Sequence, residues 1–142
     1  VRTSNLKGIT LNTNLVANMI DEMPAFFIAA SLAEGTTRVK GVKELRTKES
    51  DRLQVMSEVL DSFGVKFILE GDGITIQGLG RDGTFKASEI DSHGDHRIAM
   101  ASSIGSLRSD GENSVLDCLN VNTSFPNFIE VCKEIGIKIK ET

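Results

Sequence analysis

The amino-acid sequence predicts an α/β (α+β) domain in which helices pack against sheets. Two observations predict this class. Apolar residues at helical spacing alternate along the chain with short strand-like segments, and one pattern of helix, glycine turn and strand occurs twice, over residues 26–39 and 100–115. A further helix and strand follow each copy. The chain is therefore expected to contain two copies of one unit, about residues 1–80 and 81–142, at a period of roughly 75 residues, longer than a solenoid repeat.

Two of the predicted helices have recognisable ends. The first follows the capping candidate Ser50 and stops at Gly64, which suits the left-handed turn that ends a helix. The second has Pro126 in its first turn and stops at Gly136. Between these ends, apolar residues recur at steps of three and four, as expected for amphipathic helices.

Five short segments rich in β-branched and aliphatic residues predict strands. The sequence Glu-Gly-Asp-Gly at residues 70–73, between the second and third segments, is a typical hairpin turn. These segments do not determine how the strands are ordered in a sheet. The predicted strands are Val39–Val42, Val65–Leu69, Ile74–Ile76, Ser114–Leu116 and Ile137–Lys140.

Composition places the chain among ordinary globular proteins. Its 142 residues are 39% hydrophobic, which is enough for one compact core, and no apolar stretch reaches the roughly 20 residues of a membrane span. A net charge of −4 disfavours a nucleic-acid surface, which needs clustered Lys and Arg. Cys118 and Cys132 lack metal-ligand spacing and are expected to be reduced thiols. We therefore expect a cytoplasmic protein without metal, nucleic-acid or membrane partners.

Four polar clusters stand apart from the apolar pattern, and two of them are weak signals. Residues 20–24 either form an acidic N-cap of a helix whose first turn holds Pro24, or hold at a helix start a carboxylate, such as that of Asp21, that binds a substrate hydroxyl or accepts its proton. Taken alone, this cluster favours the cap. Residues 122–126 are typical of a helix start with a hydrophobic staple, and alone they say nothing about function.

The other two clusters place charged groups where helices begin. Over residues 45–52, Lys48 and Glu49 precede a predicted helix and Arg52 lies one turn in, although such runs are usually solvated turns. Over residues 93–100, Asp95 is expected to cap a helix that has Arg97 in its first turn. Because helix N-termini favour anions, two arginines at such positions are suited to converge on one anionic ligand.

Taken together and in this order, four motifs resemble EPSP synthase. They are Asp-Glu-x-Pro at residues 21–24, Leu-Arg-x-Lys-Glu-Ser-Asp-Arg at 45–52, Asp-His-Arg-Ile-Ala-Met-Ala at 95–101 and Ser-Phe-Pro-x-Phe at 124–128. The second and third are specific as a pair. The resemblance implies an enolpyruvyl transferase domain, an inside-out α/β barrel built from βαβαββ units. This chain would hold two of the three units of the C-terminal domain.

The resemblance also implies the reaction and the site. The enolpyruvyl group of phosphoenolpyruvate passes to the 5-hydroxyl of shikimate 3-phosphate, in the shikimate pathway, with release of phosphate and without a cofactor. Asp21 and Lys48 match residues that contact the shikimate hydroxyls, and either is a candidate base. Glu49 matches the glutamate that protonates the methylene carbon, and His96 matches a supporting histidine that, taken alone, would be an ordinary surface residue.

The remaining matches concern phosphoenolpyruvate. Arg52 and Arg97 match the pair of arginines that grips it, mainly by its carboxylate. Thr123 stands where some family members have a phosphate-binding lysine, so we expect the phosphate to be held mainly by the N-terminal domain. That domain and a third unit are absent from the sequence, which starts at Val1. We therefore expect a fragment that folds without turning over substrate and whose exposed edge invites self-association.

Two alternatives compete with this interpretation. One is the related enolpyruvyl transferase that acts on UDP-N-acetylglucosamine, which the motifs at residues 48–52 and 95–97 disfavour. The other is a non-catalytic repeat module that only binds partners, which predicts that the charged residues of the motifs scatter over the surface.

Overall fold

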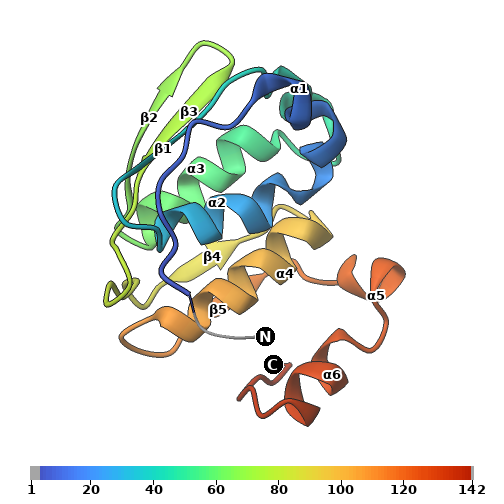
Figure 1. Ribbon diagram of the computed structural model, residues 1–142. Helices are drawn as coiled ribbons and strands as arrows, with labels where there is room; N and C mark the ends of the chain where they lie inside the picture. Colours follow the sequence, from blue (N-terminus) through green and yellow to red (C-terminus); the bar gives the residue numbers. More distant parts are fainter. Residues whose placement is uncertain (1–3, 142) are drawn as a thin grey trace.

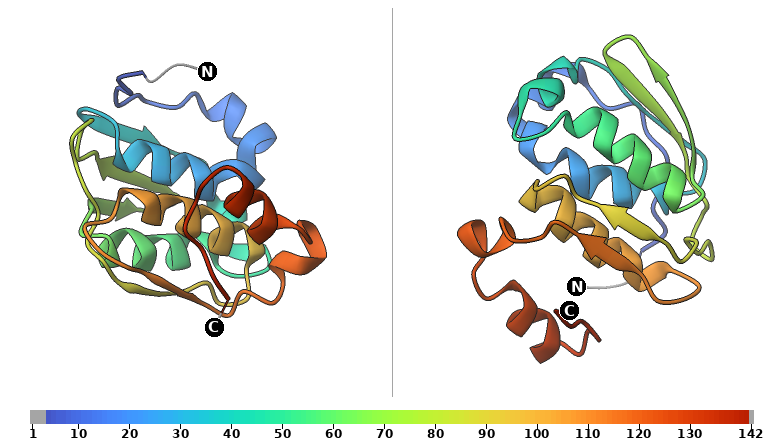
Figure 2. Two further views of the ribbon diagram at one scale, coloured as in Figure 1. Left: turned by 90° about the horizontal axis from the view of Figure 1, so that it is seen from below. Right: turned by 180° about the vertical axis from the view of Figure 1, so that it is seen from behind.

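The computed structural model describes residues 4–141 (Figure 1). Three helices, α2 (Met23–Ser31), α3 (Arg52–Ser62) and α4 (His96–Gly105), pack against one another in the middle of the molecule. A three-stranded sheet covers α2 and α3, and a two-stranded sheet lies against α3 and α4 (Figures 1 and 2). The prediction of helices packed against sheets is confirmed.

The three-stranded sheet is antiparallel and has the order β1-β3-β2. Its strands are β1 (Thr36–Val39), β2 (Lys66–Glu70) and β3 (Gly73–Gln77). The predicted hairpin joins β2 to β3, and Gly71 in its turn has a φ of +57°, which glycine adopts without steric cost. The strands predicted over residues 65–69 and 74–76 are confirmed to within one residue.

The first strand lies earlier than predicted. Val39–Val42 was the expected range, but only Val39 belongs to β1. Gly41 has a φ of +79°, so the backbone turns out of the sheet there. Val42 is buried directly before the 3₁₀ helix η2 (Lys43–Thr47). This valine is apolar because it packs in the core, not because it belongs to a strand.

The two-stranded sheet is parallel and joins β4 (Glu89–Asp91) to β5 (Ser114–Leu116). The prediction of β5 is confirmed. Strand β4 was not predicted, because its sequence Glu-Ile-Asp contains a single apolar residue. A similar parallel contact occurs in the first half of the chain, where isolated bridges place residues 7–10 beside Glu34 and Arg38.

The strand predicted at Ile137–Lys140 does not form, so that prediction is wrong. A strand needs a neighbour to pair its backbone N–H and C=O groups, and no segment within residues 4–141 forms a ladder with this one. The comparable strand β2 pairs with β3, which follows it after a short turn.

Both predicted glycine stops are confirmed. Gly64 ends α3 with a φ of +75°, and Gly136 ends α6 (Phe128–Glu134) with a φ of +89°. The prediction that Pro126 lies in the first turn of the last helix is wrong. Pro126 precedes α6, because the chain first forms a separate helix, α5 (Val121–Ser124). The remaining elements are α1 (Thr13–Val16), η1 (Ala17–Glu22) and η3 (Ser106–Arg108).

The predicted cap of α3 is displaced by one residue. Asp51, not Ser50, occupies the N-cap position, and its Oδ1 accepts a hydrogen bond of 3.0 Å from the backbone N–H of Gln54. An aspartate at this position satisfies one of the unpaired N–H groups of the first turn. Ser50 instead donates its hydroxyl to Asp95, 3.2 Å away.

The hydrophobic core has two parts. The larger part surrounds α2, α3 and the antiparallel sheet, and in it the rings of Phe63 and Phe85 stack with centroids 4.5 Å apart. The smaller part attaches α5 and α6 to α4, on the side away from the three-stranded sheet (Figure 1). Its buried members are Ala99, Val121, Phe128 and Cys132.

Both cysteines are free thiols, as predicted. Cys132 is buried and Cys118 is half-buried. Burial raises the pKa of each thiol above its ordinary value, and the nearby carboxylates of Asp117 and Asp91 raise that of Cys118 further. These thiols are therefore poor nucleophiles at neutral pH. Among the described helices, none is long and apolar enough to cross a membrane.

Candidate active site

The polar residues of the sequence motifs meet where three helices begin. Asp21 lies in η1, which runs directly into α2, while Arg52 is the first residue of α3 and Arg97 the second of α4. Hydrogen bonds join all three segments. We call this group the helix-entrance cluster. Its members are Asp21, Glu22, Glu44, Lys48, Glu49, Arg52, Asp95 and Arg97.

Arg52 is the centre of the cluster. Its side chain is 0% exposed, and each of its three nitrogens donates to a different carboxylate. Nε bonds Asp95 Oδ2 at 2.7 Å, Nη1 bonds Asp21 Oδ1 at 2.8 Å, and Nη2 bonds Glu49 Oε2 at 2.6 Å. Burial alone would lower the pKa of this guanidinium, but the bond to Asp95 and the surrounding negative charges raise it. A buried cation is tolerated when it is paired in this way.

Asp95 joins the entrances of α3 and α4. One carboxylate oxygen, Oδ1, accepts from the backbone N–H groups of Arg97 and Ile98, as the predicted cap should. The other, Oδ2, accepts from Arg52 and from the hydroxyl of Ser50. Because Asp95 is also 0% exposed, it forms a fully buried ion pair with Arg52. The sequence interpretation foresaw the cap but not the ion pair.

The acidic N-cap favoured by this cluster alone is present in position but makes no bond: Glu22 stands at the N-cap of α2 with Pro24 in the first turn, and no side chain caps the helix. Asp21 lies one residue earlier, in η1. The Asp21 carboxylate instead faces Arg52 and, at 3.5 Å, the ammonium of Lys48. Burial would raise the pKa of this carboxyl, but the hydrogen bond from Arg52 and the charges of Lys48 and Arg97 hold it below its ordinary value. Asp21 is therefore ionised at neutral pH.

Lys48 lies between two carboxylates. Its Nζ is 2.7 Å from Glu44 Oε1 and 3.5 Å from Asp21 Oδ1. The hydrogen bond to Glu44 raises the pKa of the ammonium above its ordinary value; partial desolvation opposes this, and the charge of Asp21 adds to it. Lys48 is therefore protonated at neutral pH.

Arg97 is held more loosely than Arg52. Its side chain is 35% exposed, and its Nη1 donates to the backbone carbonyl of Asp21 at 3.1 Å and lies 3.4 Å from Glu22 Oε1. Within residues 4–141, no hydrogen-bond partner is found for its Nε or Nη2. This guanidinium thus presents donors that a ligand can use.

Two predicted groups stand outside this bonding network. His96 is next to Asp95 at the start of α4 and is half-buried, but its ring makes no hydrogen bond or ion pair with the residues the structure describes. Thr123 lies in α5, and its hydroxyl donates to the carbonyl of Asn120 at 2.7 Å. The structure therefore brings together Asp21, Lys48, Glu49, Arg52 and Arg97, with His96 beside them.

Three members of the cluster were not predicted: Glu22, Glu44 and Asp95. Only Asp95 carried a usable signal. A capping aspartate employs one carboxylate oxygen, so a buried Asp cap has a second oxygen that needs a donor. An arginine at another helix entrance is a suitable one. The neighbour of Lys48 in space, Glu44, lies in a charged run where the sequence cannot tell which residues pair.

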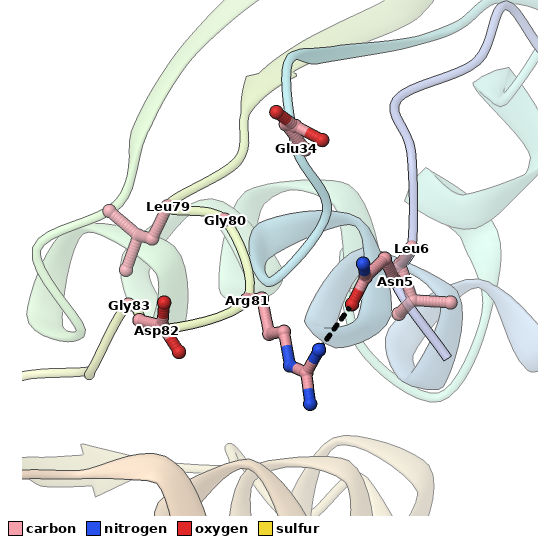
Figure 3. A pocket seen from close by; sticks show the side chains of 8 residues that line it. All are labelled: Asn5, Leu6, Glu34, Leu79, Gly80, Arg81, Asp82 and Gly83. Carbon is pink, nitrogen blue, oxygen red and sulfur yellow. Dashed lines mark hydrogen bonds between the residues drawn. The ribbon is translucent and has the colours of Figure 1, made fainter. Parts of the chain in front are cut away.

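A separate hollow of about 600 Å³ lies away from the cluster (Figure 3). It is bounded by the loop of residues 79–83, by Glu34 and by the N-terminal segment, and Arg81 reaches across it to bond Asn5 at 3.0 Å. None of the motif residues lines it. The helix-entrance cluster is therefore the stronger candidate site, because its charged groups converge.

The cluster has the groups that acid–base chemistry on an anionic substrate requires. It holds an ionised carboxylate, Asp21, close to the protonated Lys48, and a partly exposed guanidinium, Arg97, suited to a carboxylate or phosphate. The residues come from three separate helix entrances yet face one another. The binding-module alternative predicts that these charges scatter over the surface, and they do not.

Comparison with known proteins agrees with the geometry. The profile of the EPSP synthase (3-phosphoshikimate 1-carboxyvinyltransferase) family matches residues 1–132. The 3-phosphoshikimate 1-carboxyvinyltransferase of Nitrosococcus oceani is 48% identical over 140 residues, which is 99% of this chain and 31% of the relative. That of Methylococcus capsulatus is 44% identical over the same shares of the two chains.

Solved structures resemble the chain as well. EPSP synthase from Acinetobacter baumannii superposes with a TM-score of 0.92 at 44% identity, over 96% of this chain and 32% of that one. The enolpyruvyl transferase NikO from Streptomyces tendae superposes with a TM-score of 0.70 at 14% identity, over 97% of this chain and 29% of that one. At that identity the likeness concerns the fold alone.

These superpositions confirm the predicted fold class, an enolpyruvyl transferase domain. Because the family profile covers nearly all of the sequence, the chain belongs to the EPSP synthase family. It spans about a third of the length of the relatives that it matches.

Proposed function

We propose that this chain forms one wall of the active site of a 3-phosphoshikimate 1-carboxyvinyltransferase. The reaction transfers the enolpyruvyl group of phosphoenolpyruvate to the 5-hydroxyl of shikimate 3-phosphate and releases phosphate. The observation that carries the proposal is the convergence of Lys48, Arg52 and Arg97 on Asp21, from three helix entrances. The names of the relatives support the same substrates.

Asp21 is proposed as the base and Lys48 as its electrostatic partner. A base must be unprotonated when the hydroxyl approaches. The pKa of Asp21 is lowered and that of Lys48 is raised, so the carboxylate is ready to accept a proton and the ammonium is not. Lys48 then stabilises the negative charge that develops on the attacking oxygen.

Glu49 is proposed as the acid that protonates the methylene carbon of phosphoenolpyruvate. Its carboxylate is about half exposed and bonds Arg52 through Oε2, so a substrate in front of the cluster can reach it. The group must carry a proton at that step. The hydroxyl oxygen of the second substrate bonds to the neighbouring carbon, and elimination then expels phosphate and returns a proton from the new methyl group.

Arg97 is proposed as the first contact of the phosphoenolpyruvate carboxylate. It has donors without partners among residues 4–141, whereas each nitrogen of Arg52 already donates to a carboxylate. Arg52 joins the contact when Asp21 or Glu49 turns toward the substrate and leaves one of its Nη groups. His96 is proposed to assist through a hydrogen bond from its place beside Arg97.

The chain is proposed to comprise two βαβαββ units and to need the rest of the enzyme for turnover. Residues 7–10 beside Glu34 and Arg38 correspond to β4 beside β5, and α2 and α3 correspond to α4 and α6. The second unit has no counterpart of β3 within the described residues. The N-terminal domain is the proposed source of the phosphate-binding groups.

Phosphate release provides the test. The 142 residues are put in place of the matching third of the Nitrosococcus oceani relative, and release is measured with both substrates present. We expect turnover from the exchanged protein and none from the 142-residue chain alone. In the exchanged protein, Glu49→Gln should lower kcat by about a hundredfold or more, the range of a lost general acid, while phosphoenolpyruvate still binds. An unchanged kcat in the Glu49→Gln variant would show that Glu49 is not the general acid.

A further inference from the structure

The helix-entrance cluster holds more negative charge than an anion-binding site can easily accommodate. Five carboxylates surround three cations within ion-pair distance. An approaching anion meets this excess at short range, where like charges repel. At least one carboxylate must therefore draw back before an anion can bind well.

Glu22 is the carboxylate best placed to do so. Its side chain is 60% exposed, the highest value in the cluster, and its distance to Arg97 Nη1 is 3.4 Å. The other two glutamates of the cluster make closer contacts: Glu44 lies 2.7 Å from Lys48, and Glu49 lies 2.6 Å from Arg52. An exposed ion pair at this distance is weak.

Glu22 is also not used as a helix cap. Glu22 occupies the N-cap position of α2, but its side chain does not cap the helix. The reason is that η1 continues directly into α2, so the backbone of Glu22 is already helical. Its carboxylate has one partner among residues 4–141, the guanidinium of Arg97. Because its carboxylate does not cap the helix and faces Arg97 instead, Glu22 is well placed to modulate the affinity of Arg97 for an anion.

We propose that Glu22 is an affinity-determining residue that competes with the incoming anion for Arg97. It occupies Nη1 when the site is empty and swings into solvent when a ligand carboxylate arrives. This inference rests on the proposed function, since it takes phosphoenolpyruvate as the anion. The charge of Glu22 then weakens phosphoenolpyruvate binding, and its removal strengthens binding.

The test is a titration of the 142-residue chain with phosphoenolpyruvate, followed by the NMR signal of the Arg97 Nε–H group. Glu22→Gln should lower the dissociation constant by about two- to fivefold, as expected for one partly screened charge. Glu112→Gln removes the same charge from an exposed loop and should leave the constant unchanged. Glu22→Asp retains the charge and should stay within about twofold of the wild type.

The outcomes separate this inference from the proposed function. Equal constants for the wild type and Glu22→Gln would overturn the role of Glu22 and leave the function standing. If Glu112→Gln increases the affinity for phosphoenolpyruvate as much as Glu22→Gln does, the effect comes from net charge, and the role of Glu22 is again overturned. If no variant shifts the Arg97 signal, the anion-binding role of Arg97 is refuted, and that of Glu22 with it. Tighter binding by Glu22→Gln without turnover in the exchanged protein would refute the function alone.

Discussion

The entrances of α3 and α4 look alike in sequence and differ in structure. Each has a capping aspartate followed closely by an arginine, Asp51 with Arg52 and Asp95 with Arg97. Arg52 is 0% exposed and bonds three carboxylates within 2.8 Å. Arg97 is 35% exposed, and its one carboxylate partner among the described residues is 3.4 Å away. One arginine organises the site, and the other is available to a ligand.

The two caps explain the difference. Each aspartate uses one oxygen to cap its helix and the other to bind an arginine. The second oxygen of Asp51 bonds Arg46 at 2.9 Å on the exposed surface, whereas that of Asp95 bonds Arg52 in the interior. The capping aspartate is therefore peripheral at α3 and central at α4, because only Asp95 points between the helices.

The largest expected effect separates the two arginines by stability. Arg52→Ala leaves Asp95 buried without its partner and should lower the free energy of unfolding by about 3–5 kcal/mol. Arg97→Ala removes an exposed contact and should cost less than about 1 kcal/mol. Urea denaturation followed by circular dichroism measures both. Similar losses would show that Arg52 is no more structural than Arg97.

The second prediction compares the two caps. Asp95→Asn keeps a capping side chain but removes the charge that faces Arg52, and should cost about 1.5–3 kcal/mol, the range for a hydrogen bond to a charged group. Asp51→Asn should cost less than about 1 kcal/mol, because its ion pair is exposed. Thermal and urea denaturation of the two variants provide the comparison. A larger loss of stability for Asp51→Asn than for Asp95→Asn would contradict the assignment of Asp95 as the central cap and Asp51 as the peripheral one.

The third prediction concerns acid. Because the pKa of Asp21 is lower in the folded chain than in the unfolded one, its ionised form stabilises the fold above the unfolded value, about 3.9, and this contribution is lost as pH falls through the folded pKa. Because the Asp21 side chain is about half exposed, this contribution to the free energy of unfolding is at most about 1 kcal/mol. Asp21→Asn should therefore be less stable than the wild type at pH 7, and the gap should narrow as pH falls below the unfolded value. A gap that stays the same or widens as the solution is acidified would contradict the lowered pKa.

The smallest effect concerns Lys48. Since the hydrogen bond to Glu44 is the main reason that its pKa is raised, Glu44→Gln should lower that pKa while leaving the stability of the fold nearly unchanged, because the ion pair is exposed to solvent. An NMR titration of the lysine Nζ group reports the pKa directly. Glu58→Gln, a change on the exposed face of α3, is the control and should leave Lys48 unaffected. If Glu44→Gln does not move the pKa of Lys48, the proposed pairing is absent in solution.

Local sequence signals predicted most of the fold. The glycine stops at Gly64 and Gly136, the hairpin at residues 70–73 and β5 depend on neighbouring residues, and all are confirmed. The failures involve long-range partners. The segment at residues 137–140 has strand-like composition but no ladder among the described residues, and β4 forms despite its polar sequence because β5 lies beside it.

The candidate site shows the same limit. The motifs identified most of the groups that converge, because a family resemblance carries spatial information that composition lacks. Burial was not predictable, since the environment of Arg52 depends on Asp21 and Asp95, 31 and 43 residues away in sequence. The ion pair of Glu22 with Arg97, 75 residues away, was missed for the same reason. That of Glu44 with Lys48 is local and was missed because it lies in a run of charges.

Hydrogen exchange of the arginine Nε–H groups, followed by NMR in the ligand-free chain, tests the central distinction most directly. The Nε–H of Arg52 is bonded to a buried carboxylate, so it should exchange at least about tenfold more slowly than that of the partly exposed Arg97. Equal exchange of the two groups would contradict the assignment of Arg52 as the fixed centre and of Arg97 as the open cation.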